Sequence, residues 1–194
     1  MSTDKGHGLA EIRALIEDSV KVKESLYGGQ IENIEKAAAA LIKSLKAEGK
    51  VLVFGNGGSA ADSQHIVAEL VGRFKKERRA LAAIALTANT STMSAIANDY
   101  GYEFTFSRQV EALGNKGDVA LGISTSGRSK NVIDALRKAR ALGLVTIGLA
   151  GSGGGAMKGE CDILIALDSK DTPRVQEAHI LIGHIICQLV EDGI

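Results

Sequence analysis

Residues 119–129 read VALGISTSGRS, a short apolar run followed at once by a cluster of hydroxyl side chains. The run at 119–123 has the length and composition of a buried strand, and a helical pattern follows from about Asn131. Buried strands that alternate with helices are typical of a doubly wound parallel sheet. We therefore predict an α/β fold in which helices flank a five-stranded parallel sheet. Its other strands are expected at Val51 to Phe54, Ala82 to Leu86, Leu144 to Leu149 and Ile163 to Leu167.

Two helical patterns precede the first of these strands. Apolar residues recur at helical spacing between Ile12 and Leu26 and again between Ile31 and Leu45. We expect the two helices to form an antiparallel arm that packs on the domain or on a neighbouring subunit, with homo-oligomerisation as its use. The sequence thus predicts one domain over residues 1–194, with a helical arm over 1–48 and an α/β core over 49–194.

The composition argues against several classes of partner. The chain has 23 Lys and Arg residues against 23 Asp and Glu residues, so it has no net charge to attract nucleic acid or an anionic membrane surface. The first thirty residues lack the pattern of a signal peptide, and no apolar run approaches the roughly 20 residues that span a bilayer. We expect a cytoplasmic protein without nucleic-acid or membrane partners. Cys161 and Cys187 lack metal or redox spacing and are interpreted as buried structural side chains.

The loops that follow the strands are the expected location of chemistry, because ligands of such sheets bind beyond the carboxyl ends of the strands. The strongest signal is the loop after residue 123, where four hydroxyls in six residues meet the beginning of a helix. Free N–H groups and the helix dipole favour an anion there, so a phosphate cradle is predicted. The plainer alternative is that Ser129 is an N-cap and the others are turn residues. The hydroxyl residues are Ser124, Thr125, Ser126 and Ser129.

A second loop, GNGGSA at 55–60, leaves the first strand and enters a helix, so its glycines allow close approach of a ligand to the backbone. The loop also fits the dinucleotide pattern G-x-G-x-x-A. However, the acidic residue expected at the end of the next strand is missing, because Leu86 is followed by Thr87, Ala88 and Asn89. A nicotinamide cofactor is therefore disfavoured. The glycine-rich stretch at 151–155 is interpreted as a tight connection after a strand.

Two pairs of polar residues on helices are candidates for catalysis or metal binding. His65 and Glu69 are four residues apart and share one helix face, where they could bind a divalent metal, or Glu69 could act as a base. A solvated His and a surface Glu are the ordinary alternative. His184 lies in an apolar stretch, as core histidines often do. It lies roughly 12 Å along the helix from Gln176, so the two converge only if the first turn is irregular or the site is shared between subunits.

Taken together, these motifs resemble the phosphoheptose isomerase branch of the sugar isomerase (SIS) family. Gly-Asn-Gly-Gly-Ser, His-x-x-x-Glu, Asn98 with Asp99, Ser-Thr-Ser-Gly-x-Ser and Gln-Glu-x-His with a second His five residues on appear in this order over nearly the whole chain. The resemblance implies an isomerase that converts sedoheptulose 7-phosphate to D-glycero-D-manno-heptose 7-phosphate through an enediol. It also implies a homotetramer and a role in making heptose for lipopolysaccharide or a similar glycan.

The resemblance further implies roles for individual residues. Glu69 would be the base and His184 the second proton carrier, while His179 would be structural. One Zn²⁺ per subunit would be held by His65, Glu69, Gln176 and His184. The phosphate would contact Ser124, Thr125, Ser126 and Ser129, and the rest of the substrate would contact Asn56, Gly57, Gly58, Glu69, Asn98, Asp99 and Gln176. In some relatives the loop that corresponds to residues 169–173 places an acidic residue close to the site. This chain has Asp171, Thr172 and Pro173 in that loop.

The main alternative is a non-catalytic SIS protein that binds the replication initiator. Such proteins keep the phosphate-type loop but lack the equivalents of Glu69 and His184, which this chain has. A sugar-phosphate-sensing regulator would need an attached DNA-binding domain, and an amidotransferase would need a glutaminase domain with an N-terminal Cys. We see neither in the sequence, so the isomerase is preferred.

Overall fold

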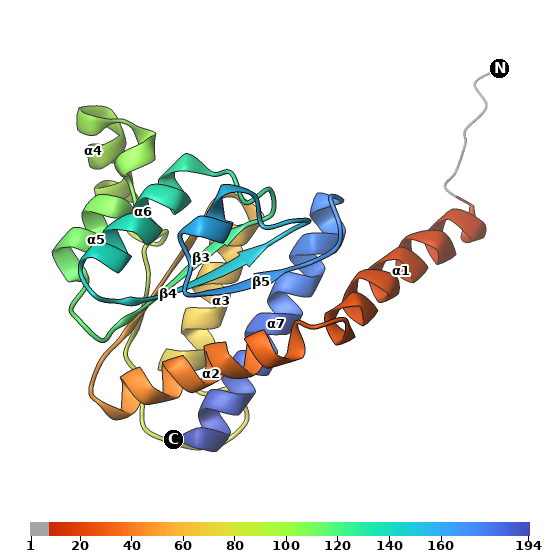
Figure 1. Cartoon of the computed structure of the whole chain (residues 1–194), viewed down its shortest axis with the longest axis horizontal. Coiled ribbons are helices and arrows are strands. Elements are labelled where there is room, and N and C mark those ends of the chain that lie inside the picture. The colour runs from red at the N-terminus through yellow and green to blue at the C-terminus, as the bar shows by residue number, and fades with distance from the viewer. Residues whose placement is uncertain (1–7) are drawn as a thin grey trace.

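The computed structural model describes residues 8–194 and confirms the predicted α/β fold. Five parallel strands lie in the order β2-β1-β3-β4-β5, with helices on both faces of the sheet (Figure 1). The strands are β1 Val51–Gly55, β2 Ala83–Ala85, β3 Val119–Ser124, β4 Val145–Ala150 and β5 Ile163–Ala166. The helices are α1 Leu9–Glu24, α2 Ile31–Lys46, α3 Gly58–Val71, α4 Thr90–Tyr100, α5 Ser107–Leu113, α6 Lys130–Ala141 and α7 Thr172–Gly193. Short 3₁₀ turns are η1 Ser25–Tyr27, η2 Tyr102–Phe104 and η3 Gly155–Gly159.

The strand order locates the candidate ligand crevice. The chain moves outward from β1 to β2 and then returns to the other side of β1 to form β3. The loops after β1 and β3 therefore lead away from one another, which opens a crevice at the carboxyl ends of these two neighbouring strands. These are the loops in which the sequence predicted the chemistry.

Alternation along the strands divides the core between the two faces. In β1, Val51 and Val53 pack in the cluster that includes α2, α3 and α7, whereas Leu52 and Phe54 pack in the cluster that includes α5 and α6. Because both faces of every central strand are covered, the strands are continuously apolar rather than alternating with polar residues. Because α3 and α7 pack on one face of the sheet and α6 packs on the other, the buried strands hold the beginnings of these helices in place.

The N-terminal helices differ from the prediction of an antiparallel arm. α2 belongs to the helical layer, and its side chains Ile34, Leu41 and Leu45 are buried in the same core cluster as the sheet and α7. α1 leads away from the body beyond the beginning of α2, so the two helices run end to end (Figure 1). The prediction was wrong because the apolar face of α2 is covered by the sheet and α7, which leaves it no face for α1.

α1 is held to the body at the beginning of α7. Ser19 Oγ donates a hydrogen bond to the Glu177 carboxylate at 2.5 Å, and Arg174 Nη1 donates to the Leu15 carbonyl at 2.7 Å. Val22 of α1 is buried in the core, whereas the large apolar side chains nearer the beginning of the helix are exposed: Leu9, Ile12, Leu15, Ile16 and Val20. Over residues 8–194, none of the helices combines the length and apolarity needed to cross a membrane.

Candidate active site

The loop after β1 presents Asn56 to the crevice in a fixed orientation. The side-chain amides of Asn56 and Asn131 exchange hydrogen bonds, each 2.9 Å long, and Tyr102 donates its hydroxyl to Asn56 Oδ1 at 3.0 Å. Gly57 takes a positive φ of 57°, which a glycine adopts without strain, and the next residue begins α3. Asn131 and Tyr102 were not identified from the sequence as part of the site, because their partner lies far away in the chain.

Two of the hydroxyl residues around the end of β3 lie against one another. Ser124 Oγ and Ser129 Oγ lie 2.9 Å apart, and Ser126 Oγ accepts a hydrogen bond from the Arg128 N–H at 3.2 Å. Ser129 occupies the N-cap position of α6, but its side chain makes no capping hydrogen bond. The plainer interpretation of Ser129 as an N-cap is therefore not supported, and its hydroxyl is turned toward Ser124 at the carboxyl end of the sheet.

The glycine-rich stretch after β4 supports this hydroxyl loop. The Gly151 N–H donates to the Thr125 carbonyl at 3.0 Å, and the Met157 N–H donates to the Gly127 carbonyl at 3.2 Å. A Cβ placed on Gly127, whose φ is +62°, would lie 2.2 Å from the Gly154 carbonyl oxygen. The two loops are thus in backbone contact, and only glycines allow that approach.

Two cationic residues that the sequence analysis missed lie beside the hydroxyl loop. A cavity of about 190 Å³ separates this loop from the beginning of α7, and both Arg128 and Lys170 line it with exposed side chains. A phosphate in a cradle made only of hydroxyls would have no positive charge to balance it, and these two residues would supply that charge. The full lining is Thr125, Ser126, Arg128, Ser152, Lys170 and Thr172.

A cluster of His65, Glu69 and His184 forms where α3 and α7 lie side by side. His65 Nε2 is 3.1 Å from Glu69 Oε1 and 2.9 Å from His184 Nε2, and one ligand atom from each residue lies within 4.8 Å of the others. A Cβ on Gly183 would lie 2.8 Å from the Ile66 side chain, so this glycine permits the close approach of the two helices. His184 is therefore not a core histidine, because it belongs to this partly exposed cluster.

The cluster has the chemistry of a divalent metal site. Two imidazole nitrogens and a carboxylate oxygen face one another, and each can offer a lone pair. These are the ligand types that Zn²⁺ prefers in proteins. The residues present therefore fit the ion that the family resemblance implies.

Gln176 lies away from this cluster within one chain. A Cβ on Gly58 would lie 2.4 Å from Gln176 Nε2, so the Gln176 amide packs against the beginning of α3. Gly58 and His65 are seven residues apart, a rise of about 10 Å along the helix. The structure thus brings three of the four expected ligands together and places Gln176 beside Gly58.

Asn98 and Asp99 also lie apart from the crevice. They are exposed near the end of α4, a helix with no buried residue, and Asn98 Nδ2 donates to Asp99 Oδ1 at 2.8 Å. α4 stands away from the sheet in Figure 1. Its other face, including Met93 and Ala97, lines a cavity of about 390 Å³ that also includes Asn56 and Gly57.

Several other titratable groups are buried or partly buried. Burial raises the pKa of Asp62, one turn before His65, although the charge of His65 opposes the rise, and Asp62 Oδ2 has no hydrogen-bond partner. His179 is fully buried, neither of its ring nitrogens has a well-formed hydrogen bond, and burial lowers its pKa to about 4 despite the opposing effect of the Ala150 backbone. Burial raises the pKa of Cys161 and Cys187 to about 12 each, so both thiols remain protonated.

Comparison with known proteins agrees with this geometry. Residues 15–151 match the family model of the SIS domain, so the fold and the crevice define an SIS-domain protein. A phosphoheptose isomerase of Campylobacter jejuni is 59% identical over 82% of this chain and 86% of its own length, and one of Clostridium acetobutylicum is 53% identical over 93% of both. The chain belongs to the phosphoheptose isomerase family.

Solved structures lead to the same family. A phosphoheptose isomerase from Neisseria gonorrhoeae superposes with a TM-score of 0.89 at 40% identity, covering 94% of this chain and 98% of that one. The enzyme from Francisella tularensis gives a TM-score of 0.91 at 37% identity, covering 95% and 98%. The resemblance in the sequence is therefore confirmed, and so is the SIS fold.

Proposed function

We propose that this protein interconverts sedoheptulose 7-phosphate and D-glycero-D-manno-heptose 7-phosphate, the first step toward nucleotide-activated heptose. The observation that carries the proposal is the convergence of Glu69 and His184, a base and a proton carrier from separate helices, at His65. The chain's family membership and the hydroxyl loop after β3, which offers a phosphate site, support the same substrate class.

The reaction moves one proton between neighbouring carbons. Glu69 takes a proton from C1 of the open-chain ketose, which leaves an enediol, and returns it to C2. His184 donates a proton to the C2 oxygen and accepts the proton of the C1 hydroxyl, so that C1 becomes the aldehyde. Both side chains are only partly exposed, which limits the water that competes for these protons.

His65, Glu69 and His184 would hold a Zn²⁺ ion, with Gln176 as the proposed fourth ligand. When bound, this ion would supply Lewis-acid polarisation of the substrate's carbonyl oxygen. Asn56 and the glycines after it would contact the sugar chain, and the hydroxyls of residues 124–129 would hold the phosphate. Asn98 and Asp99 are proposed to contact the sugar as well.

We further propose a cytoplasmic homotetramer. The exposed apolar residues of α1, including Leu9 and Ile16, and a groove of about 740 Å³ between α1, α2 and α7 offer faces that a second copy of the chain would cover. Assembly would also allow Gln176, Asn98 and Asp99 to contribute to sites completed by a neighbour. Sedimentation of the purified protein at the mass of a single chain would contradict this assembly.

The test of the isomerase is conversion of sedoheptulose 7-phosphate by purified protein, comparing wild type with Glu69→Gln. Loss of the base should lower kcat by roughly 100- to 10,000-fold. Glu77→Gln is the matched control, because Glu77 is 89% exposed in the loop after α3 and should keep wild-type turnover. No turnover by metal-replete wild type would favour the non-catalytic SIS protein that binds the replication initiator.

A further inference from the structure

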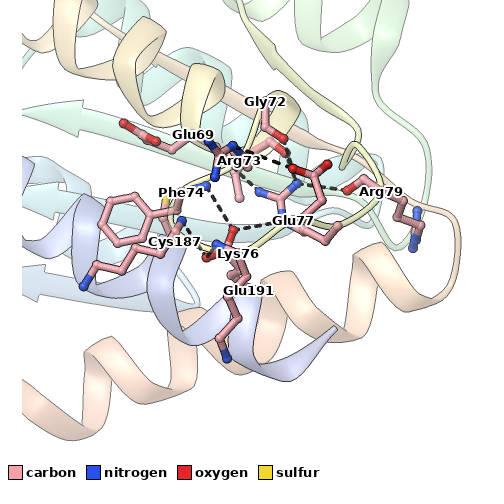
Figure 2. A network of polar contacts seen from close by, with 12 residues as sticks. Glu69, Gly72, Arg73, Phe74, Lys76, Glu77, Arg79, Cys187 and Glu191 are labelled. Carbon is pink, nitrogen blue, oxygen red and sulfur yellow. Dashed lines mark hydrogen bonds and ion pairs between the residues drawn. The ribbon is translucent and has the colours of Figure 1, made fainter.

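The segment 72–82, which joins α3 to β2, is fastened to α7 by a buried carboxylate (Figure 2). The Glu191 side chain is 2% exposed and accepts hydrogen bonds from the backbone N–H groups of Phe74 at 3.0 Å and of Lys75 and Lys76 at 2.8 Å each. Arg78 Nε lies 3.4 Å from Glu191 Oε1, an ion pair rather than a well-aligned hydrogen bond. One carboxylate thus holds three consecutive residues of the loop.

Arg78 connects the same carboxylate to the end of α3. Its side chain is 10% exposed, and Nη2 donates to the carbonyl of Glu69 at 2.8 Å, while Nη1 donates to the carbonyls of Leu70 at 3.0 Å and Gly72 at 3.2 Å. Carbonyls in the last turn of a helix have no partner within the helix. Arg78 therefore satisfies these carbonyls, and in doing so it ties the backbone of Glu69 to Glu191.

Phe74 extends this support to the second catalytic residue. Its ring centroid lies 5.5 Å from that of His184, and the His184 ring lies 5.0 Å from that of His65. Because Glu191 accepts the Phe74 N–H, it fixes the residue whose ring lies against His184. Arg78 thus supports the backbone of Glu69, and Glu191 supports the ring of His184 through Phe74. The two supports are linked because Arg78 and Glu191 form an ion pair.

A buried ion pair is weak evidence for stability, because well-packed apolar residues stabilise a fold as well or better. We propose that Glu191 and Arg78 are positioning residues that set the separation between Glu69 and His184. Neither residue belongs to the His65, Glu69 and His184 cluster, so both act on it through other residues. The kinetic part of this inference rests on the proposed isomerase, whereas its effect on metal binding at the cluster can be measured separately.

The first test compares Glu191→Gln with wild type and with Asp192→Asn. Asp192 is the matched control, because it is the next residue and also pairs with the loop, at Lys76. Its side chain is exposed, whereas that of Glu191 is buried. Loss of outer support usually costs 10- to 100-fold in activity or metal affinity. We expect Glu191→Gln to lower kcat and to weaken Zn²⁺ binding by the metal-free protein, each by about 10- to 100-fold, with KM within about threefold. Asp192→Asn should stay within about twofold of wild type in all three.

Phe74→Leu keeps the test decisive if Glu191→Gln does not fold. This variant leaves the ion pair intact and removes only the ring beside His184, so kcat should fall about tenfold at unchanged KM. A purely structural role would reduce the amount of folded protein but leave the Zn²⁺ affinity of the folded fraction unchanged. That result for Glu191→Gln, or wild-type kcat for Phe74→Leu, would overturn the proposal. Weakened Zn²⁺ binding in these variants, with no turnover by wild type, would overturn the isomerase alone.

Discussion

Acidification should destabilise this protein through one buried imidazole, that of His179. Burial lowers its pKa from the ordinary 6.5 to about 4, so the folded protein binds the proton far less readily than the unfolded chain. The stability that the neutral ring contributes is fully present above pH 6.5 and is lost as the pH falls to about 4. A difference of about 2.5 units corresponds to about 3 kcal/mol of unfolding free energy over this interval.

The measurement is urea-induced unfolding of wild type and His179→Leu at several values between pH 7 and pH 4, at one protein concentration. All other titratable groups are common to both proteins, so the difference between the two unfolding free energies isolates His179. That difference should shift by about 3 kcal/mol against the wild type as the pH falls. A difference that stays constant within about 1 kcal/mol would refute the argument from burial.

Two further predictions concern the loops of the site. Lys170→Met should raise KM for the sugar phosphate about tenfold and change kcat little, because Lys170 lines the cavity beside the hydroxyl loop. The control is Lys158→Met, at an exposed residue of η3, which should leave kcat and KM unchanged. If both variants raised KM equally, Lys170 would have no local role in binding the sugar phosphate. Gly127→Ala should lower the unfolding free energy by about 2–3 kcal/mol, because its Cβ would lie 2.2 Å from the Gly154 oxygen. If Gly127→Ala unfolded in urea with the same free energy as the wild type, the two loops would have to separate at little cost.

Features set by neighbouring residues could be predicted from the sequence. The strands were located nearly to the residue, because apolar runs between helices leave few alternatives, as for β1 at Val51–Gly55. The proximity of His65 and Glu69 follows from helix geometry alone. The hydroxyl loop was found because its four members lie within six residues of one another in the chain.

Contacts between distant segments were not predictable in the same way. α3 and α7 both begin at the carboxyl edge of the sheet, so His184, eight residues after Gln176, reaches the depth of His65, seven residues after Gly58. This shared origin explains why His184 meets His65 while Gln176 remains beside Gly58. The pairing of Arg78 with Glu191 depends on the path of the loop after α3, which has no local signal in the sequence.

The backbone contact between the loops after β3 and β4 has a consequence for how relatives of this protein can diverge. A side chain at Gly127 or Gly155 would push the two loops apart. We therefore expect relatives with the same loop contact to keep glycine at both positions. The cavity beside the hydroxyl loop is also lined by Lys170 and Thr172, whose exposed side chains can vary without crowding the contact between the two loops. New substrate preferences should therefore arise at residues 170–172, where α7 begins, and a designer seeking altered specificity should randomise these residues first.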